Sequence, residues 1–285
     1  MNSPIEDTLK KLLSDKLLAI EAHLNADVLV YNGNLGPLPA NVFLNLVEDL
    51  QKDAGKHDSL YVILTTNGGS AEMVERYVNI LRHHYTEINF IVPDYAYSAG
   101  TIFCMSGDSI YMDYFSVLGP IDPQVLNKEG KYIAALGYLD KVNEFVLKAA
   151  TGNLTNAELI WMKEIDLGEL RSFEQARDLT IDLLKRWLVI YKFKSWNQHR
   201  NGNQVTPAEK QQRAEEIARE LSDNKVWKSH GKGITISELT NLKLKIEDYS
   251  NDAVLRPLIR DYYNTMEEYV RTHNLGLFIH NRVFI

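Results

Sequence analysis

The chain has 285 residues, 45% of them hydrophobic and 24% charged, a composition typical of globular proteins. Its net charge of -7 argues against a nucleic-acid partner, because nucleic-acid-binding proteins carry a basic surface. No run of about 18 apolar residues occurs, so we expect no transmembrane segment. Cys104 is the only cysteine, which excludes an intramolecular disulfide. Charged residues throughout positions 1–25 exclude a secretory signal, so we expect a cytoplasmic protein.

The first half of the chain predicts an α/β body. Residues 1–25 predict an amphipathic helix. Apolar runs and helical patterns then alternate up to residue 125, which indicates βαβ units and a mostly parallel sheet. The predicted strands are 27–31, 60–64, 88–92 and 109–112, and the predicted helices are 40–53, 70–85 and 98–106. The segment 116–124 contains Pro120 and Pro123 and is expected to be extended.

The second half is largely helical. The predicted helices are 136–150, 155–165, 169–195, 207–222, 236–241 and 252–273, with one further strand at 242–246. Thr206, Pro207 and Glu209 predict a capped start for the helix at 207–222.

Two turns in the first half carry the residues that point to chemistry. The strand at 60–64 ends in Thr66-Asn67-Gly68-Gly69-Ser70, and the strand at 88–92 leads to Tyr97-Ser98-Ala99-Gly100-Thr101. A hydroxyl among small residues at a strand-to-helix turn is where α/β enzymes expose a nucleophile. Paired glycines let backbone N–H groups approach a substrate oxygen. Together the two turns predict a nucleophile, Ser98, and an oxyanion hole at Gly68 and Gly69. The alternatives are that Ser98 is a small residue needed for tight packing and that the two glycines form an ordinary turn.

These motifs, followed by Ser116-Val117-Leu118-Gly119-Pro120-Ile121-Asp122-Pro123-Gln124, resemble the serine dehydrogenase proteinase family. That family is similar to signal peptide peptidase A and falls within the Clp protease proteolytic subunit/crotonase superfamily. A weaker fourth match is Ser229-His230-Gly231-Lys232-Gly233-Ile234-Thr235. The resemblance implies an α/β fold, a Clp protease/crotonase-like spiral of βαβ units with a largely helical C-terminal half. It also implies self-assembly and peptide-bond hydrolysis by an activated serine.

Carried onto this chain, the resemblance implies Ser98 as the nucleophile. It implies an oxyanion hole made by the N–H of Gly68 or Gly69 together with that of Ala99. Residues 1–25 would then be an N-terminal amphipathic helix, 26–250 a Clp/crotonase-like serine peptidase domain, and 251–285 a C-terminal helix and tail.

The general base is less clear from the sequence. Relatives resembling the Clp subunit place a histidine soon after the serine, and the segment 119–124 has none. Relatives resembling signal peptide peptidase use a lysine further on, and Lys141 lies 43 residues after Ser98 near a helix start. A desolvated lysine can act as a base, so Lys141 is favoured, with a solvated surface lysine as the alternative.

Three further residues are candidates for a part in proton transfer. Lys148, on the same helical face as Lys141, is expected to be a surface lysine. His230 competes as base because histidine titrates near neutrality, with a plain loop histidine as its alternative. Asp122 is either an orienting group or, as we favour, a turn former between prolines.

The expected function is a serine endopeptidase of the Ser-Lys dyad type, acting on a peptide or unfolded protein. A crotonase-like acyl hydrolase and an inactive oligomeric scaffold remain alternatives. No motif for metal or nucleotide binding occurs, so we expect no cofactor and no metal. We expect a homo-oligomer, because the N-terminal helix and the helix near 179–190 offer more apolar surface than one sheet can cover.

Overall fold

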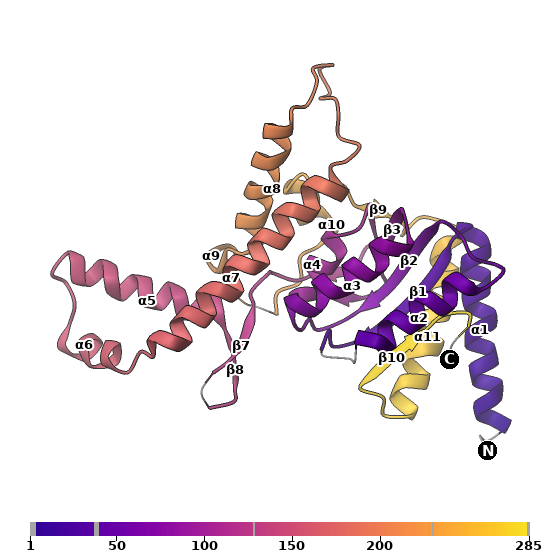
Figure 1. Cartoon of the computed structure of the whole chain (residues 1–285), viewed down its shortest axis with the longest axis horizontal. Helices are drawn as coiled ribbons and strands as arrows, with labels where there is room; N and C mark the ends of the chain where they lie inside the picture. Colours follow the sequence, from indigo (N-terminus) through magenta and orange to yellow (C-terminus); the bar gives the residue numbers. More distant parts are fainter. Residues whose placement is uncertain (1–3, 37–39, 128, 228, 230, 284–285) are drawn as a thin grey trace.

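A six-stranded sheet forms the centre of the molecule (Figure 1). The computed structural model describes residues 4–36, 40–127, 129–227, 229 and 231–283. The strand order is β10-β1-β2-β3-β5-β9, with β10 antiparallel to β1 and every other pair parallel. The strands are β1 (Asp27–Gly33), β2 (Ser59–Thr65), β3 (Glu87–Val92), β5 (Ser109–Met112), β9 (Glu247–Asp248) and β10 (Leu277–His280).

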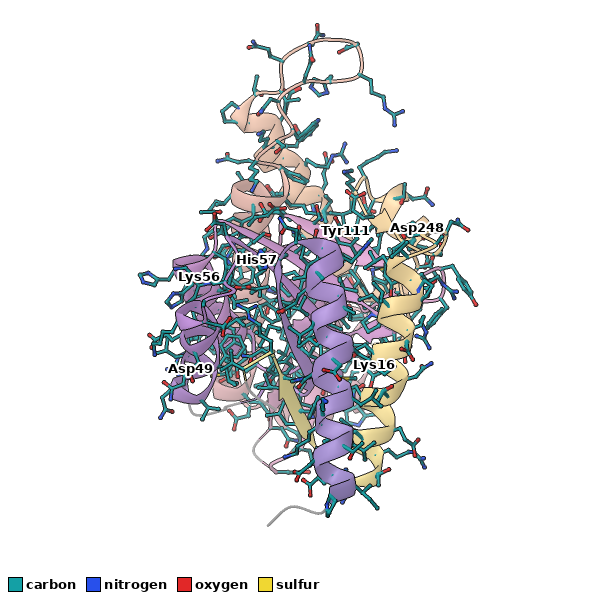
Figure 2. The ribbon with its side chains drawn as sticks, turned by 90° about the vertical axis from the view of Figure 1, so that its right-hand side faces the viewer. Lys16, Asp49, Lys56, His57, Tyr111 and Asp248 are labelled. Atoms are coloured by element: carbon teal, nitrogen blue, oxygen red, sulfur yellow. The ribbon has the colours of Figure 1, made fainter. Side chains whose placement is uncertain are left out.

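Helices cover both faces of this sheet, which explains why its strands are nearly continuous apolar runs. In β2, Leu60, Val62 and Leu64 pack on one side with α2 (Ala40–Lys52) and α3 (Ala71–His84). Ile63 packs on the other side with α1 (Pro4–Leu24) and α11 (Leu255–Thr272). Figure 2 shows α1 and α11 side by side on that face, where Lys16 of α1 forms an ion pair with Asp261 of α11.

The four strands predicted in the first half are confirmed, and so is the amphipathic helix at the N-terminus. The strand predicted at 242–246 is wrong. Its alternation of leucine and lysine is typical of a half-buried strand, but Lys243 has φ 65° and the chain turns there at the end of α10 (Ile236–Asn241). The strand that pairs with β5 is β9, which follows directly. β10 was not predicted, because four residues are too few for a period of two to stand out.

The helical half extends away from the sheet. Figure 1 shows α5, α6 and the beginning of α7 projecting to the left, and we call this part, residues 135–178, the arm. The hairpin of β7 (Gln124–Leu126) and β8 (Tyr132–Ala134) precedes it. The helices are α5 (Ala135–Ala150), α6 (Asn156–Lys163), α7 (Leu167–Trp187), α8 (Pro207–Leu221) and α9 (Asn224–Trp227).

The predicted helix 169–195 ends earlier than expected. α7 stops at Trp187 and the chain continues as one π-helical turn, Leu188–Lys192. The predicted cap of α8 is confirmed: the Thr206 hydroxyl accepts from the Glu209 N–H at 3.2 Å, and the Glu209 carboxylate accepts from the Thr206 N–H at 2.8 Å. The expectation of uncovered apolar surface on α1 and α7 is corrected by the packing. Most of the apolar side chains of these two helices are buried within the chain, among them Leu13, Leu17, Leu183, Leu184 and Trp187.

A histidine buried in β10 makes stability depend on pH. His280 is fully buried, with Nδ1 2.8 Å from the Tyr262 hydroxyl, and burial lowers its pKa from 6.5 to about 4. The unfolded chain therefore binds the proton more readily, so this contribution to stability is complete above pH 6.5 and is lost as pH falls toward 4. We expect urea unfolding to show a loss of about 1.4 kcal/mol per pH unit in that window.

The matched variants are His280→Gln, which should remove this part of the pH dependence, and His23→Gln on the exposed side of α1, which should leave it unchanged. An identical pH dependence in wild type and His280→Gln would rule out the assignment.

Candidate active site

Ser98 occupies a strained turn at the start of α4 (Ala99–Met105). Its backbone has φ 52° and ψ -113°, and its side chain makes no cap hydrogen bond to the helix. A non-glycine residue in such a conformation costs about 1–3 kcal/mol and is found mainly at functional sites. The side chain is only 6% exposed. The fold thus holds one hydroxyl in a costly position, as expected of a nucleophile at a strand-to-helix turn.

Small residues around Ser98 let three segments pack closely. A Cβ on Gly100 would lie 2.4 Å from the Thr66 methyl carbon, so only glycine fits there. The Thr101 hydroxyl is 2.9 Å from the Ala96 carbonyl oxygen and 2.8 Å from that of Gly119, and it accepts from the Gly119 N–H. These contacts fix the turn against a small parallel sheet of β4 (Tyr95–Ala96) and β6 (Val117–Leu118).

Of the two glycines after β2, Gly68 lies directly against the Ser98 turn and Gly69 packs against Leu35. A Cβ on Gly68 would be 3.0 Å from the Ser98 Cβ and 3.4 Å from the Ala99 nitrogen. A Cβ on Gly69 would be 2.3 Å from the carbonyl oxygen of Leu35. Both glycines have positive φ, 110° and 151°. The structure therefore brings Gly68 against Ser98 and Ala99, with Gly69 next to it in the chain, and both close approaches require glycine.

Hydrogen bonding distinguishes the two glycines. The Gly68 N–H donates to the Thr66 hydroxyl at 3.0 Å, so it already has an acceptor. Within the described ranges, the N–H groups of Gly69 and Ala99 have no acceptor. Two unoccupied donors beside a serine hydroxyl are what an oxyanion needs, and they favour Gly69 over Gly68.

Asp122 joins the Ser98 turn to the arm, a link that we did not predict. It is 2% exposed, and its backbone carbonyl lies 3.4 Å from the Ser98 hydroxyl oxygen, which donates to it. Its carboxylate accepts from the N–H of Leu136, the second residue of α5, at 3.0 Å. A carboxylate at a helix N-terminus stabilises the helix. The two prolines beside Asp122 suggested only a turn, because nothing local shows which helix start the carboxylate will reach.

Lys141 lies on α5, where its side chain contacts other residues of the same helix. Its ammonium is 2.8 Å from the Glu144 carboxylate and 5.0 Å from the centre of the Phe145 ring, and its side chain is 52% exposed. Among the described residues, no hydrogen bond or ion pair joins Lys141 to Ser98. Lys148 pairs with Glu144 and Glu158, and hydrogen bonds to these carboxylates raise its pKa.

His230 lies outside the described residues. The segment after it does reach the small sheet beside Ser98, because Ile234 and Leu118 exchange two backbone hydrogen bonds of 2.7 and 3.1 Å. A Cβ on Gly233 would be 2.8 Å from the Val117 side chain, so this contact is close.

Three other features bear on the chemistry of the site. Among the described residues, no three His, Cys, Asp or Glu side chains are grouped so that they could hold a metal. None of the helices in the described part of the chain is long and apolar enough to cross a membrane. Cys104 is fully buried on α4, and burial raises the pKa of its thiol, so it is a poor nucleophile.

The chain belongs to the family of ClpP-like SDH-type serine proteinases. The model of that family matches residues 50–194, half of the chain, a range that includes both glycines, Ser98 and Lys141. The predicted family is confirmed, and with it the predicted α/β fold class of the Clp protease/crotonase type.

Two curated relatives, both uncharacterised proteins of Methanocaldococcus jannaschii, are similar to parts of the chain. MJ1495 is 26% identical over 187 residues, which cover 65% of this chain and 51% of the relative. MJ0137 is 39% identical over 72 residues, 25% of each protein. The chain thus spans about half the length of one relative and a quarter of the other.

Three solved structures are similar to the chain, each at low sequence identity. Two are mutants of the 1510-N membrane-bound stomatin-specific protease, with 12% and 14% identity and TM-scores of 0.43 and 0.44. The matches cover 78% and 81% of this chain, and 79% and 78% of those chains; the second structure contains a substrate peptide. A mutant of ClpP1 from Listeria monocytogenes is 10% identical with a TM-score of 0.44, covering 82% of this chain and 98% of its own.

Proposed function

We propose that the protein is a serine peptidase in which Ser98 is the nucleophile. The observation that carries the proposal is the strained Ser98 turn with the unoccupied N–H groups of Gly69 and Ala99 beside it. Membership of a serine proteinase family supports it. The substrate is a peptide or an unfolded protein.

The chemistry follows from this arrangement. The Ser98 oxygen attacks a peptide carbonyl carbon while its proton passes to a base, and the carbonyl oxygen becomes an oxyanion that Gly69 and Ala99 stabilise. As this intermediate collapses, the base gives its proton to the departing nitrogen, the C–N bond breaks, and the amine leaves behind an acyl-enzyme. Water then attacks the ester, releases the carboxylic acid and restores the serine.

We propose Lys141 as the base, with His230 as the alternative. Lys141 lies within the matched range 50–194, whereas His230 does not. Side chains on a helix lean toward its N-terminus, and the N-terminus of α5 is the end bonded to Asp122. Lys141 is five residues, about 7.5 Å, along the helix from Leu136. To act as base, Lys141 must leave Glu144 and turn back toward Ser98.

Labelling with a fluorophosphonate probe tests this function. We expect wild-type protein to be labelled on Ser98 and the Ser98→Ala variant not to be labelled. No labelling of the wild type, with no hydrolysis of casein, would favour an inactive scaffold. Hydrolysis of acyl thioesters without peptide cleavage would favour the crotonase-like alternative.

We also propose that copies of the chain assemble through the tip of the arm. Large apolar side chains are exposed there, and clusters of this kind usually mark interfaces. They are Val146, Leu147, Leu159, Ile160, Trp161 and Leu167.

Light scattering at micromolar concentration should give a mass at least twice the 32.6 kDa of one chain. Ile160→Glu on the arm should lower the mass to that of one chain, because it places a charge in the apolar interface. Leu18→Glu, which alters an exposed leucine of α1, should not. A monomeric wild type would contradict the assembly, and dissociation by Leu18→Glu alone would place the interface on α1 instead.

A cytoplasmic location is proposed from the acidic net charge and the single free cysteine.

A further inference from the structure

Asp122 holds the start of α5, because that helix has no capping side chain of its own. Ala134, the residue before α5, carries only a methyl group. The first two N–H groups of the helix instead donate to residues that precede the β7–β8 hairpin. The Ala135 N–H donates to the Pro123 carbonyl at 2.9 Å, and the Leu136 N–H donates to the Asp122 carboxylate at 3.0 Å. The position of α5 therefore depends on the segment that contains Asp122.

The other long helices of the second half are capped locally. α6, α7 and α8 follow Thr155, Asp166 and Thr206, whose side chains accept from N–H groups in the first turn of the same helix. A local cap stabilises its helix wherever the helix lies. A cap from a remote residue also fixes where the helix begins relative to that residue, and Asp122 does this for α5, from which the arm projects (Figure 1).

The same residue contacts the nucleophile. The Asp122 backbone carbonyl accepts from the Ser98 hydroxyl at 3.4 Å, a long hydrogen bond of the kind found in resting active sites. Ser98 thus directs its hydroxyl hydrogen to the segment that holds α5. Asp122 is only 2% exposed, so it acts on its neighbours in the protein and not on a substrate.

The backbone around Asp122 has little freedom to move. Pro120 and Pro123 each fix φ at about -65°. Between them, the Ile121 N–H donates to the Leu221 carbonyl at the end of α8 at 2.9 Å. A displacement of α5 is therefore transmitted to the Ser98 contact instead of being absorbed by a flexible loop.

We propose that Asp122 is a positioning residue for the peptidase reaction. Its carboxylate fixes α5, the helix that carries Lys141, relative to the Ser98 hydroxyl that its own carbonyl holds. The proposal rests on the peptidase function proposed above. A misplacement of about 1 Å can lower an enzymatic rate on the order of 10²-fold, so a buried hydrogen bond away from the substrate can control the rate.

Substitutions of Asp122 test the proposal through kcat and KM on a fluorogenic peptide and through the rate at which a fluorophosphonate labels Ser98. Asp122→Ala removes the acceptor for the Leu136 N–H. It should lower kcat and the labelling rate on the order of 10²-fold and leave KM nearly unchanged, because Asp122 does not touch the substrate.

Two conservative variants separate position from charge. Asp122→Asn loses the charge but keeps an oxygen that can accept from the Leu136 N–H, so kcat should stay within about threefold of the wild type. Asp122→Glu keeps the carboxylate but lengthens the side chain by one C–C bond, ~1.5 Å. It should lower kcat about tenfold, because the helix start is displaced from the Ser98 turn.

Asp166→Ala is the matched control, because it removes another capping carboxylate from the arm. The Asp166 side chain accepts from the N–H groups of Gly168 and Glu169 at the start of α7. Both alanine variants should lower the temperature of thermal unfolding, since both remove a helix cap. Only Asp122→Ala should lower kcat.

Equal kcat in Asp122→Ala and Asp166→Ala would overturn the positioning role and leave the peptidase function standing. A raised KM with unchanged kcat in Asp122→Ala would also overturn it, because that pattern belongs to a substrate-binding residue. Where Asp122→Ala is too unstable to assay, the other two variants decide, and equal kcat in Asp122→Asn and Asp122→Glu would overturn the role. A wild type that neither cleaves the peptide nor takes the label would overturn both proposals.

Discussion

Replacing Ser98 by alanine is expected to abolish peptide hydrolysis, with a loss on the order of 10⁴-fold or more in kcat, because the acyl-enzyme can no longer form. The fold should be unaffected. The lost oxygen makes a single 3.4 Å hydrogen bond, to the Asp122 carbonyl. Initial rates on a fluorogenic peptide and thermal unfolding of the same samples measure the two effects separately.

Two further variants serve as controls for the Ser98→Ala result. Ser106→Ala removes one hydroxyl from the far end of the same helix, and it should keep full activity. Ser98→Gly should be as inactive as Ser98→Ala but at least as stable as the wild type, because glycine relieves the strain at φ 52°. Activity of Ser98→Ala near that of the wild type would exclude Ser98 as the nucleophile.

The strands and the two motif turns could be predicted because their signals are local. An apolar run with helices on both sides indicates a buried parallel strand, and a close backbone approach needs glycine whatever lies further along the chain. The choice between Gly68 and Gly69 could not be predicted, because it depends on the Thr66 hydroxyl taking up the Gly68 N–H.

Contacts between segments that are distant in the sequence could not be predicted either, because they depend on how the chain folds between them. The carboxylate of Asp122 reaches Leu136 only because the β7–β8 hairpin returns the chain to it. The pairing of Lys141 with Glu144 also could not be predicted, because spacing along the chain does not show which partner a helical side chain takes.

The base should be revealed by the pH dependence of kcat/KM in the wild type and in variants of Lys141 and His230. A lysine base acts only after losing its proton, so the rate should still be rising above about pH 8; an imidazole base should give a rate that levels off by about pH 7.5. If Lys141 is the base, Lys141→Ala should lose on the order of 10²–10⁴-fold in rate. His230→Gln should then lose little.

Variants of Lys141 and its neighbours distinguish a need for positive charge at this position from a need for proton transfer. Lys141→Arg keeps a positive charge for Glu144 but cannot give up its proton, so it should be as inactive as Lys141→Ala. Lys148→Ala removes the neighbouring lysine that also pairs with Glu144, and it should remain active. Full activity of Lys141→Arg, together with loss of activity in His230→Gln, would transfer the role to His230, and the profile of the wild type should then level off near neutrality.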